Sequence, residues 1–398
     1  MNPELSSFAA RLRELIASLV AAEVTRLKSL KPDAGISDLI KSEPPHIGCY
    51  NHEFNALALE LFALQFKHNS AYRKICEARK LTPEVVGHWT QIPAVPTVAF
   101  KELELTLLAP DERTTVFHSS GTTEQKPSRH FHSAESLKIY EASLTPWFLE
   151  NVRTDLRFTI YDLRLICLTP PPEQVPHSSL VHMFETVRQT MGAPETAFVG
   201  KTAADGAWTL DFDAALAALG NNPQSAICNP QLILGTAFSF VHLLDYMVER
   251  DLRVELPAGS HVMETGGYKN RSRTMPKTEL HALITERLGV PRENIICEYG
   301  MSELSSQAYD SKFHHPSSII HQRVFSFPPW ARVQIISPET GREVAEGETG
   351  LIRVFDLANV FSVAAIQTED LAIRRGGGFE LIGRTQLAEP RGCSLMTA

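Results

Sequence analysis

The sequence predicts an α/β fold of layered, mainly parallel sheets that are covered by helices. Apolar runs of strand length alternate with helical stretches such as Lys277–Arg287, and 398 residues suffice for one large domain or two ordinary ones. A loop rich in hydroxyls directly follows Val116 and Phe117, and such loops lie at the carboxyl ends of strands in layered folds. The runs predicted to be strands are Leu163–Leu168, Gln231–Leu234, Leu252–Leu256 and Asn294–Glu298.

Residues 1–110 are predicted to form a mainly helical N-terminal part. Asn2 is placed to cap a first helix with Pro3 at its first position, and an apolar segment over 54–66 precedes the proline-rich turn at 93–96. One face of the first helix is apolar, and we expect it to pack in the core rather than to anchor a membrane. That face carries Phe8, Leu12, Leu15, Ile16 and Leu19.

The pattern changes towards the carboxyl end of the chain. Ala331–Ile336 and Leu351–Phe355 flank turn residues and predict antiparallel strands. We expect residues 320–384 to form a small antiparallel, barrel-like sheet. The predicted large domain then spans 1–384, and 385–398 form a short tail.

The loop from His118 to Arg129 has the composition of a phosphate cradle. Glycine allows a tight fold in which several backbone N–H groups converge on an anion, and hydroxyls add donors. One glycine and no closing Lys-Ser/Thr pair disfavour a kinase-like or GTPase-like P-loop. A plain turn between two strands is the alternative. The donors are Ser119, Ser120, Gly121, Thr122 and Thr123.

Three later motifs follow this loop in order: Tyr299-Gly300-Met301-Ser302-Glu303, Thr368-Glu369-Asp370 and Gly383-Arg384. Their order and spacing resemble the adenylate-forming superfamily of acyl-activating enzymes. Within it, the chain is most similar to the acyl-protein synthetase family, which works beside fatty acid reductases in bacterial luminescence. The likeness covers the chain from about Ile92 to its end. It is carried by Ile92–Thr97, Phe100–Lys101, Ser128, Thr265–Lys269, Gly383–Arg384 and Arg391–Leu395.

The resemblance implies a nucleotide site for ATP. The five cradle residues would hold the pyrophosphate end, with Lys126 or Arg129 as cationic helpers, whereas Glu124 departs from the pattern, which usually has glycine there. Gly266 and Gly267 resemble the tight turn over adenine.

Tyr299 would offer a flat face to adenine, and Gly300 would allow close backbone approach. Ser302 would donate to the α-phosphate, and Glu303 would hold Mg²⁺ through a hard oxygen. Asp370 and Arg384 resemble the pair at the ribose. Ser302 as the cap of a helix, and surface ion pairs for Asp370 and Arg384, are the alternatives that require no nucleotide.

Cys393 lies in the predicted tail between Arg391-Gly392 and Ser394. In the resemblance a tail cysteine takes the acyl group from the adenylate as a thioester, and Arg391 would lower the pKa of such a thiol. An inert buried cysteine is the alternative. The other cysteines, at 49, 76, 167, 228 and 297, are expected to pack in the core.

The superfamily normally continues past the Gly-Arg motif with a mobile domain that carries a catalytic lysine. Only residues 385–398 follow Arg384, so we expect that domain to be lacking here. A cation would then have to come from the large domain or from a partner.

Composition excludes several classes. A formal charge of −8, without runs of basic and aromatic residues, disfavours nucleic acid as a partner. Six scattered cysteines without a C-x-x-C pair suit reduced thiols rather than disulfides or a zinc site, and His130 and His132 have no third ligand at a recognisable spacing. Charges interrupt the apolar N-terminus, and no stretch is long enough to span a bilayer. We expect a cytoplasmic protein.

The sequence thus predicts a ligase that uses ATP and Mg²⁺ to convert a carboxylic, fatty acid to acyl-AMP. The acyl group would pass to Cys393 and then to a partner such as an acyl-CoA reductase. Two alternatives stay open: a ligase that hands the acyl group to coenzyme A or to a carrier protein, like arylacetate-CoA ligases, and a non-catalytic nucleotide-binding subunit of a reductase complex. Gly235–His242 is a further, apolar candidate for a wall of the acyl site.

Overall fold

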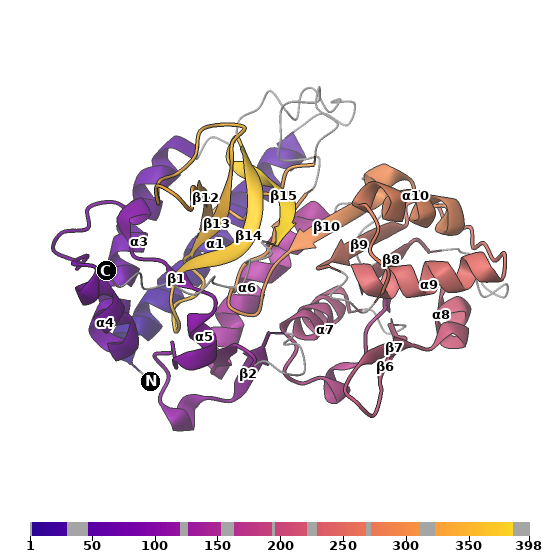
Figure 1. Ribbon diagram of the computed structural model, residues 1–398, viewed down its shortest axis with the longest axis horizontal. Coiled ribbons are helices and arrows are strands. Elements are labelled where there is room, and N and C mark those ends of the chain that lie inside the picture. The colour runs from indigo at the N-terminus through magenta and orange to yellow at the C-terminus, as the bar shows by residue number, and fades with distance from the viewer. Residues whose placement is uncertain are drawn as a thin grey trace, which may run out of the picture.

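The computed structural model describes residues 2–29, 47–119, 126–152, 163–192, 196–220, 229–267, 272–310 and 323–384. The first helices and the last strands lie together on the left of Figure 1, and a parallel sheet with its covering helices lies on the right. This is the mixed α/β architecture with a mainly parallel sheet and a small antiparallel sheet that the sequence predicts.

The larger sheet has six strands in the order β11-β10-β9-β8-β4-β5, and all neighbours are parallel except β10 and β11. Both faces are covered, which is why β8, β9 and β10 are buried at every position. Its strands are β4 (Arg164–Cys167), β5 (Ala197–Phe198), β8 (Gln231–Thr236), β9 (His261–Thr265), β10 (Ile295–Tyr299) and β11 (Ala308–Tyr309).

Alternate side chains of these strands enter two different cores. Ile233 and Val262 pack with the helices α8, α9 and α10, whereas Leu232 and Met263 belong to the cluster that includes α6 and α7. The helices on the Leu232 and Met263 side of the sheet are α6 (Ala134–Asn151) and α7 (Ser179–Met191). The opposite face is covered by α8 (Phe212–Leu219), α9 (Ala237–Glu249) and α10 (Lys277–Leu288).

The second sheet has the order β1-β14-β13-β12, with β15 also pairing β14, and is antiparallel except for β1. The predicted small antiparallel sheet is present, and along the described strands its order is an open path. Its strands are β1 (Val95–Pro96), β12 (Ala331–Ile336), β13 (Thr349–Asp356), β14 (Ala365–Arg375) and β15 (Gly378–Arg384).

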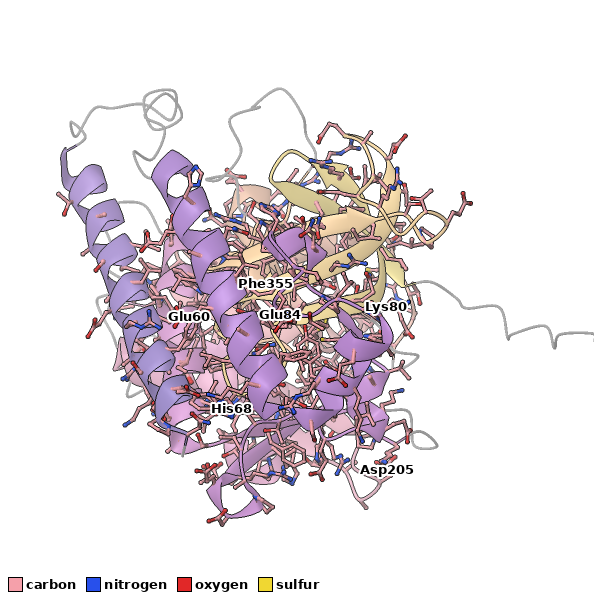
Figure 2. The ribbon with its side chains drawn as sticks, turned by 90° about the vertical axis from the view of Figure 1, so that its left-hand side faces the viewer. Glu60, His68, Lys80, Glu84, Asp205 and Phe355 are labelled. Carbon is pink, nitrogen blue, oxygen red and sulfur yellow. The ribbon has the colours of Figure 1, made fainter. Side chains whose placement is uncertain are left out.

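Of the N-terminal helices, α3 packs against this second sheet, whereas α1 contacts α3 and α6. In Figure 2 Phe355 lies beside α3, the helix that carries Glu60 and His68, and the Phe54 ring on α3 lies 6.0 Å from the Phe355 ring. Gln65 Nε2 donates to the Asn359 carbonyl at 2.8 Å, and Gln65 Oε1 accepts from the Ala364 N–H at 3.0 Å. The helices are α1 (Pro3–Ser29), α3 (Ile47–His68), α4 (Ser70–Ala78) and α5 (Ala99–Glu102).

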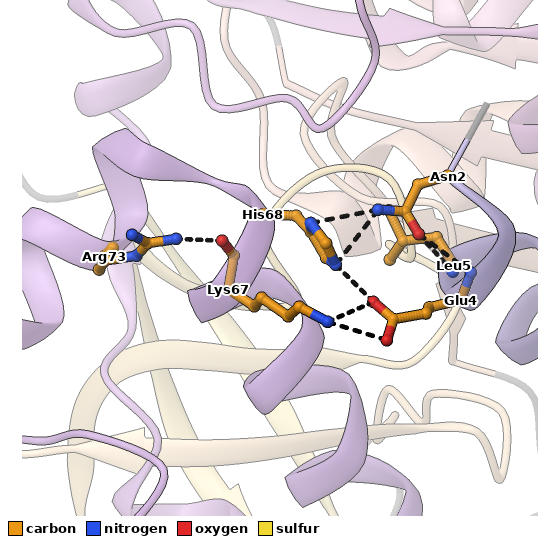
Figure 3. Close-up of polar contacts among 6 residues, drawn as sticks. All are labelled: Asn2, Glu4, Leu5, Lys67, His68 and Arg73. Atoms are coloured by element: carbon orange, nitrogen blue, oxygen red, sulfur yellow. Dashed lines mark hydrogen bonds and ion pairs between the residues drawn. The ribbon is translucent and has the colours of Figure 1, made fainter.

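A polar cluster joins the start of α1 to the end of α3. Asn2 caps α1 as predicted, since its side-chain oxygen accepts the Glu4 N–H at 2.9 Å. Glu4 in turn contacts Lys67 Nζ at 2.8 Å and His68 Nε2 at 2.7 Å (Figure 3). The predicted apolar face of α1 is confirmed, because Phe8 and Leu12 on that face are buried.

Two short hairpins and four 3₁₀ turns complete the described elements. The hairpins are β2 (Thr115–His118) with β3 (Arg129–His132), and β6 (Gly200–Thr202) with β7 (Trp208–Leu210). The 3₁₀ turns are Trp89–Gln91, Pro110–Glu112, Pro172–Gln174 and Arg292–Asn294.

One strand prediction is wrong and another strand was missed. Leu252–Leu256 is not a strand, because the Val254 and Leu256 N–H groups bond the Arg287 and Leu288 carbonyls at the end of α10 instead of a sheet neighbour. The sheet takes its strand from the next segment, His261–Thr265. The subdivision of the chain at residues 110, 320 and 384 stays a prediction.

The described helices include none that is both long and apolar enough to cross a membrane.

Candidate active site

Two residues near the ends of the predicted phosphate loop, Ser119 and Ser128, form the closed base of a hairpin. The Ser119 N–H donates to the Ser128 carbonyl at 3.3 Å, and the Ser128 N–H donates to Ser119 Oγ at 3.0 Å. The hairpin β2–β3 thereby fixes both ends of the loop. Ser120, Gly121, Thr122 and Thr123, together with Glu124, lie outside the described residues.

The motif after β10 meets this hairpin. Ser128 Oγ lies 3.5 Å from Ser302 Oγ, and His130 Nδ1 lies 2.8 Å from the Ser302 carbonyl. Ser302 Oγ also donates to Glu303 Oε2 at 3.0 Å. Both Ser302 and Glu303 are buried in a turn, so the alternative in which Ser302 caps a helix is wrong. The fold brings two motifs that are 174 residues apart into contact.

Tyr299 connects the two sheets. Its hydroxyl donates to Asp370 Oδ2 at 2.9 Å, although Tyr299 ends β10 and Asp370 lies on β14. Asp370 is in register with Arg384 on β15, so the two residues predicted at the ribose are strand neighbours. The Tyr299 ring packs edge-on against the Phe379 ring, 5.3 Å away.

The predicted glycine turn follows β9. Gly266 has φ +70°, a conformation that favours glycine, and a Cβ added to Gly266 or Gly267 would meet no atom of the described residues within 4 Å. The described residues therefore leave the backbone of this turn open to a flat ring.

Gly300 is needed for a different reason. A Cβ at this position would lie 2.2 Å from Glu298 Oε1, so only glycine leaves room for that carboxyl group. The other oxygen of Glu298 accepts a hydrogen bond from Thr265 Oγ1. Burial raises the pKa of Glu298 to about 7, although the Thr265 hydrogen bond opposes the rise. The site thus includes a titratable carboxyl group that the sequence analysis did not single out.

Two buried polar side chains, Asp356 and Asn359, hold the backbone of the turn at 301–306 through hydrogen bonds. Asp356 Oδ2 accepts the N–H groups of Ser305 at 2.9 Å and Ser306 at 2.8 Å, and Asn359 Nδ2 donates to the Glu303 carbonyl at 2.8 Å. Burial raises the pKa of Asp356 to about 6 against these hydrogen bonds. Sequence reasoning missed both residues; the signal was an acid directly after an apolar strand.

The two proposed cationic helpers lie beside acidic side chains. Lys126 Nζ is 3.8 Å from Glu102, and Arg129 is 3.6 Å from Glu104. The Lys126–Glu102 pair is exposed, whereas Arg129 is only 29% exposed. Exposed pairs contribute on the order of 0–1 kcal/mol, so an incoming phosphate can compete for Lys126.

His130 and His132 lie within an aromatic cluster. Their rings are 4.3 Å apart, and His132 lies 4.7 Å from the Phe117 ring. Burial lowers the pKa of His130 to about 4, so the residue is neutral and holds Ser302 through a hydrogen bond.

Three cysteines lie buried in the interior. Cys76, Cys167 and Cys297 are buried, as predicted, and form no disulfide with one another. Cys297 also donates to Glu264 Oε1 at 2.6 Å, which plain packing does not explain. Cys393 lies outside the described residues. Phe240 and Val241, from the segment proposed to wall the acyl site, instead pack in the core between the sheet and α8–α10.

The chain is similar to known proteins along most of its length. The model of the family described as acyl-protein synthetase, LuxE, matches residues 28–398. A long-chain-fatty-acid–luciferin-component ligase of Aliivibrio fischeri is 23% identical over 384 residues, which cover 91% of this chain and 93% of the relative. The Vibrio harveyi ligase of the same name is 24% identical over 351 residues, 84% of each protein.

Solved structures show the same fold. A 2-hydroxyisobutyryl-CoA ligase in the postadenylation state, in complex with 2-HIB-AMP, superposes with a TM-score of 0.63 at 12% identity, over 89% of this chain and 72% of that one. An open conformation of that ligase gives a TM-score of 0.60 over 84% and 69%. The family match spans nearly the whole chain, and the chain therefore belongs to the acyl-protein synthetase (LuxE) family.

Proposed function

We propose that this protein uses ATP to convert a long-chain fatty acid to its acyl adenylate and then passes the acyl group to a thiol. Its family and the names of its relatives support the class of reaction and of acid. We place the activity in the cytoplasm, where thiols are kept reduced.

One observation carries the assignment to this site. The Tyr299–Asp370 hydrogen bond joins the end of β10 to the middle of β14, while Ser302 contacts the base of the β2–β3 hairpin. Adenine, ribose and phosphate groups are linked in that order in ATP. A single nucleotide bound along Gly266, Asp370 and Ser302 would therefore lie with its phosphates towards the hairpin.

The first step is attack of a carboxylate oxygen on the α-phosphorus of ATP, with pyrophosphate as the leaving group. The protein must hold the two reactants in line and offset the negative charge. Ser119 to Thr123 would donate to the departing pyrophosphate, Ser302 would donate to the α-phosphate, and Asp370 with Arg384 would hold the ribose. Glu303 offers a hard carboxylate oxygen that suits Mg²⁺, which would supply charge neutralisation at the phosphates.

The second step is attack of a thiolate on the acyl carbonyl, with AMP leaving. We assign this nucleophile to Cys393, from which the acyl group passes to a partner such as an acyl-CoA reductase. A mixed anhydride with AMP has a good leaving group, so two moderate steps replace one difficult step.

The test is exchange of labelled pyrophosphate into ATP with a panel of fatty and aromatic acids, followed by the intact mass of the protein with the best acid. The proposal expects exchange with long-chain acids and a hydroxylamine-labile acyl adduct that is absent in Cys393→Ser. Cys167→Ser, which alters a buried cysteine of β4, is the control and should keep the adduct.

The remaining outcomes separate the alternatives. Exchange without an adduct, together with CoA ligation that survives Cys393→Ser, would replace the acyl-protein step with a CoA or carrier-protein ligase. Nucleotide binding without exchange for any acid would replace the activity with a non-catalytic subunit.

A further inference from the structure

A second polar cluster lies at the ends of β9 and β10, on the face that α10 covers. Glu264 and Cys297 are direct register partners on the two strands, and His281 faces them from α10. All three side chains are buried. Three different elements thus supply a carboxylate, an imidazole and a thiol to one place in the interior.

The spacing of the three ligand atoms is that of a metal site. Cys297 Sγ lies 3.7 Å from His281 Nε2, which lies 3.5 Å from Glu264 Oε1, and the three atoms are all within 4.8 Å of one another. Ligand bonds of about 2.0–2.3 Å in a tetrahedron separate neighbouring ligands by about 3.3–3.5 Å. The exception is the thiol hydrogen bond. Cys297 Sγ and Glu264 Oε1 lie 2.6 Å apart, and this distance must increase when both atoms bind the same ion.

The second oxygen of Glu264 points to an incomplete environment. Glu264 is 0% exposed, yet its Oε2 has no hydrogen-bond partner among the described residues. A buried carboxylate oxygen without a partner costs free energy. A cation bound by both oxygens would satisfy it and would complete four-coordination together with sulfur and nitrogen.

Lys277 now supplies the positive charge. Its Nζ lies 3.0 Å from Glu264 Oε1, and it is one helical turn before His281 on α10. The Lys277 side chain is 42% exposed, so its ammonium group can withdraw into solvent and open a path to the carboxylate. In this state burial raises the pKa of Cys297 well above its usual value, and the thiol is protonated.

We propose that Glu264, His281 and Cys297 form a zinc site, in which Zn²⁺ takes the place of the Lys277 ammonium group. A thiolate with an imidazole and a carboxylate suits Zn²⁺ rather than Mg²⁺ or Ca²⁺. Binding breaks the S–H bond of Cys297, forms a Zn–S bond and releases one proton to solvent. The charge of the cluster balances, because Zn²⁺ is neutralised by one thiolate and one carboxylate.

The position gives the metal a structural role. Glu264 directly precedes Thr265-Gly266, and Cys297 lies two residues before Tyr299. A bound zinc ion would fasten β9, β10 and the first turns of α10 beneath the glycine turn and the tyrosine of the candidate active site. It would raise the thermal stability of the protein without contacting a substrate.

The test uses the full chain, freed of metal by a chelator and titrated with Zn²⁺ against a chromogenic chelator, and with Co²⁺ by absorption spectroscopy. We expect one Zn²⁺ per chain, release of one proton, a higher melting temperature and a thiolate-to-cobalt charge-transfer band. Cys297→Ser should abolish the band, and His281→Gln should weaken binding by about 100-fold or more, since even supporting residues of zinc sites are worth about 10–100-fold. Cys167→Ser, a buried cysteine in β4 of the same sheet, is the matched control and should behave as the wild type.

Lys277→Met provides a second test in case the ligand variants fail to fold, because it leaves all three ligands in place. Removal of the competing ammonium group should tighten Zn²⁺ binding. Equal or weaker binding by Lys277→Met would overturn the exchange of zinc for lysine. A wild-type protein that takes up no more Zn²⁺ than Cys297→Ser, or that gives no thiolate band with Co²⁺, would overturn the site itself.

Discussion

Glu264 and Glu298 are buried carboxyl groups at the ends of neighbouring strands, on opposite faces of the sheet, and they ionise in opposite ways. Burial alone would raise the pKa of Glu264, but the Lys277 ammonium group at 3.0 Å lowers it to about 2. Among the described residues no cation forms an ion pair with Glu298, and burial raises its pKa to about 7. The comparison teaches that one nearby cation, rather than depth in the protein, determines which carboxyl group carries charge here.

The largest expected effect comes from Glu298→Gln. Because folding raises the pKa of Glu298 from 4.5 to about 7, its contribution to stability is complete below about pH 4.5 and is lost as the pH rises to about 7. The glutamine variant cannot lose this contribution. We expect it to be more stable than the wild type at pH 8 by on the order of 3 kcal/mol, as measured by urea unfolding between pH 4 and 8.

The control for this prediction is Glu249→Gln, whose wild-type carboxylate sits on a side chain that is 73% exposed. It should keep the pH dependence of the wild type. A Glu298→Gln variant with the same pH dependence as the wild type would mean that Glu298 is charged throughout, and the contrast with Glu264 would disappear.

Lys277→Met tests the other side of the comparison in metal-free protein. The substitution leaves the Glu264 carboxylate buried without its cation, so we expect a loss of about 1–3 kcal/mol at pH 7. The value is below that of a fully buried pair because Lys277 is 42% exposed. The loss should shrink as the pH falls, since the carboxyl group can then bind a proton.

The exposed ion pair between Lys201 and Asp211 offers the control for Lys277. Lys201→Met should change the free energy of unfolding by less than about 0.5 kcal/mol, because Lys201 is 64% exposed. If Lys277→Met were equally neutral, then the lysine would not be what holds Glu264 ionised.

Tyr299→Phe is expected to have a smaller effect on stability, about 1 kcal/mol, because it removes the hydrogen bond to Asp370. The Michaelis constant for ATP in the exchange assay should rise as the two sheets lose this link. Tyr309→Phe is the matched control, since the buried Tyr309 hydroxyl bonds no group in the part of the chain that the structure describes. An unchanged constant for ATP in Tyr299→Phe would place the nucleotide away from this contact.

The smallest expected effect on stability is that of Lys126→Ala, less than about 0.5 kcal/mol, because its ion pair with Glu102 is exposed. If Lys126 helps to hold phosphate, the constant for ATP should rise even so. Glu102→Gln removes the same ion pair but keeps the lysine, and it should leave that constant unchanged or lower it.

Much of the fold could be predicted from the sequence because local patterns dominate its elements. The helix α10 and the strands β4, β8 and β10 lie where apolar periodicity places them. The exception at Leu252–Leu256 has a tertiary cause. The segment satisfies its N–H groups on the end of α10, and no property of its own residues distinguishes that choice from a sheet.

The short strand β1 shows the same limit. Val95 and Pro96 lie in a segment whose prolines predict a turn, yet Val95 pairs Ile366 and Pro96 pairs Gln367 of β14 in parallel. Proline is tolerated at a strand edge. A pairing across about 270 residues depends on where the rest of the chain has already folded.

The sequence by itself determined the α/β class and the cap and buried face of the first helix, and it supplied the motifs proposed for the nucleotide site, because each depends on neighbours within a few positions. Only the tertiary structure decided that Tyr299 meets Asp370, that Asp356 holds the turn at Ser305, and that Glu264, His281 and Cys297 share one site. Strand register and helix packing bring those atoms together, and the spacing of the residues along the chain does not predict these contacts.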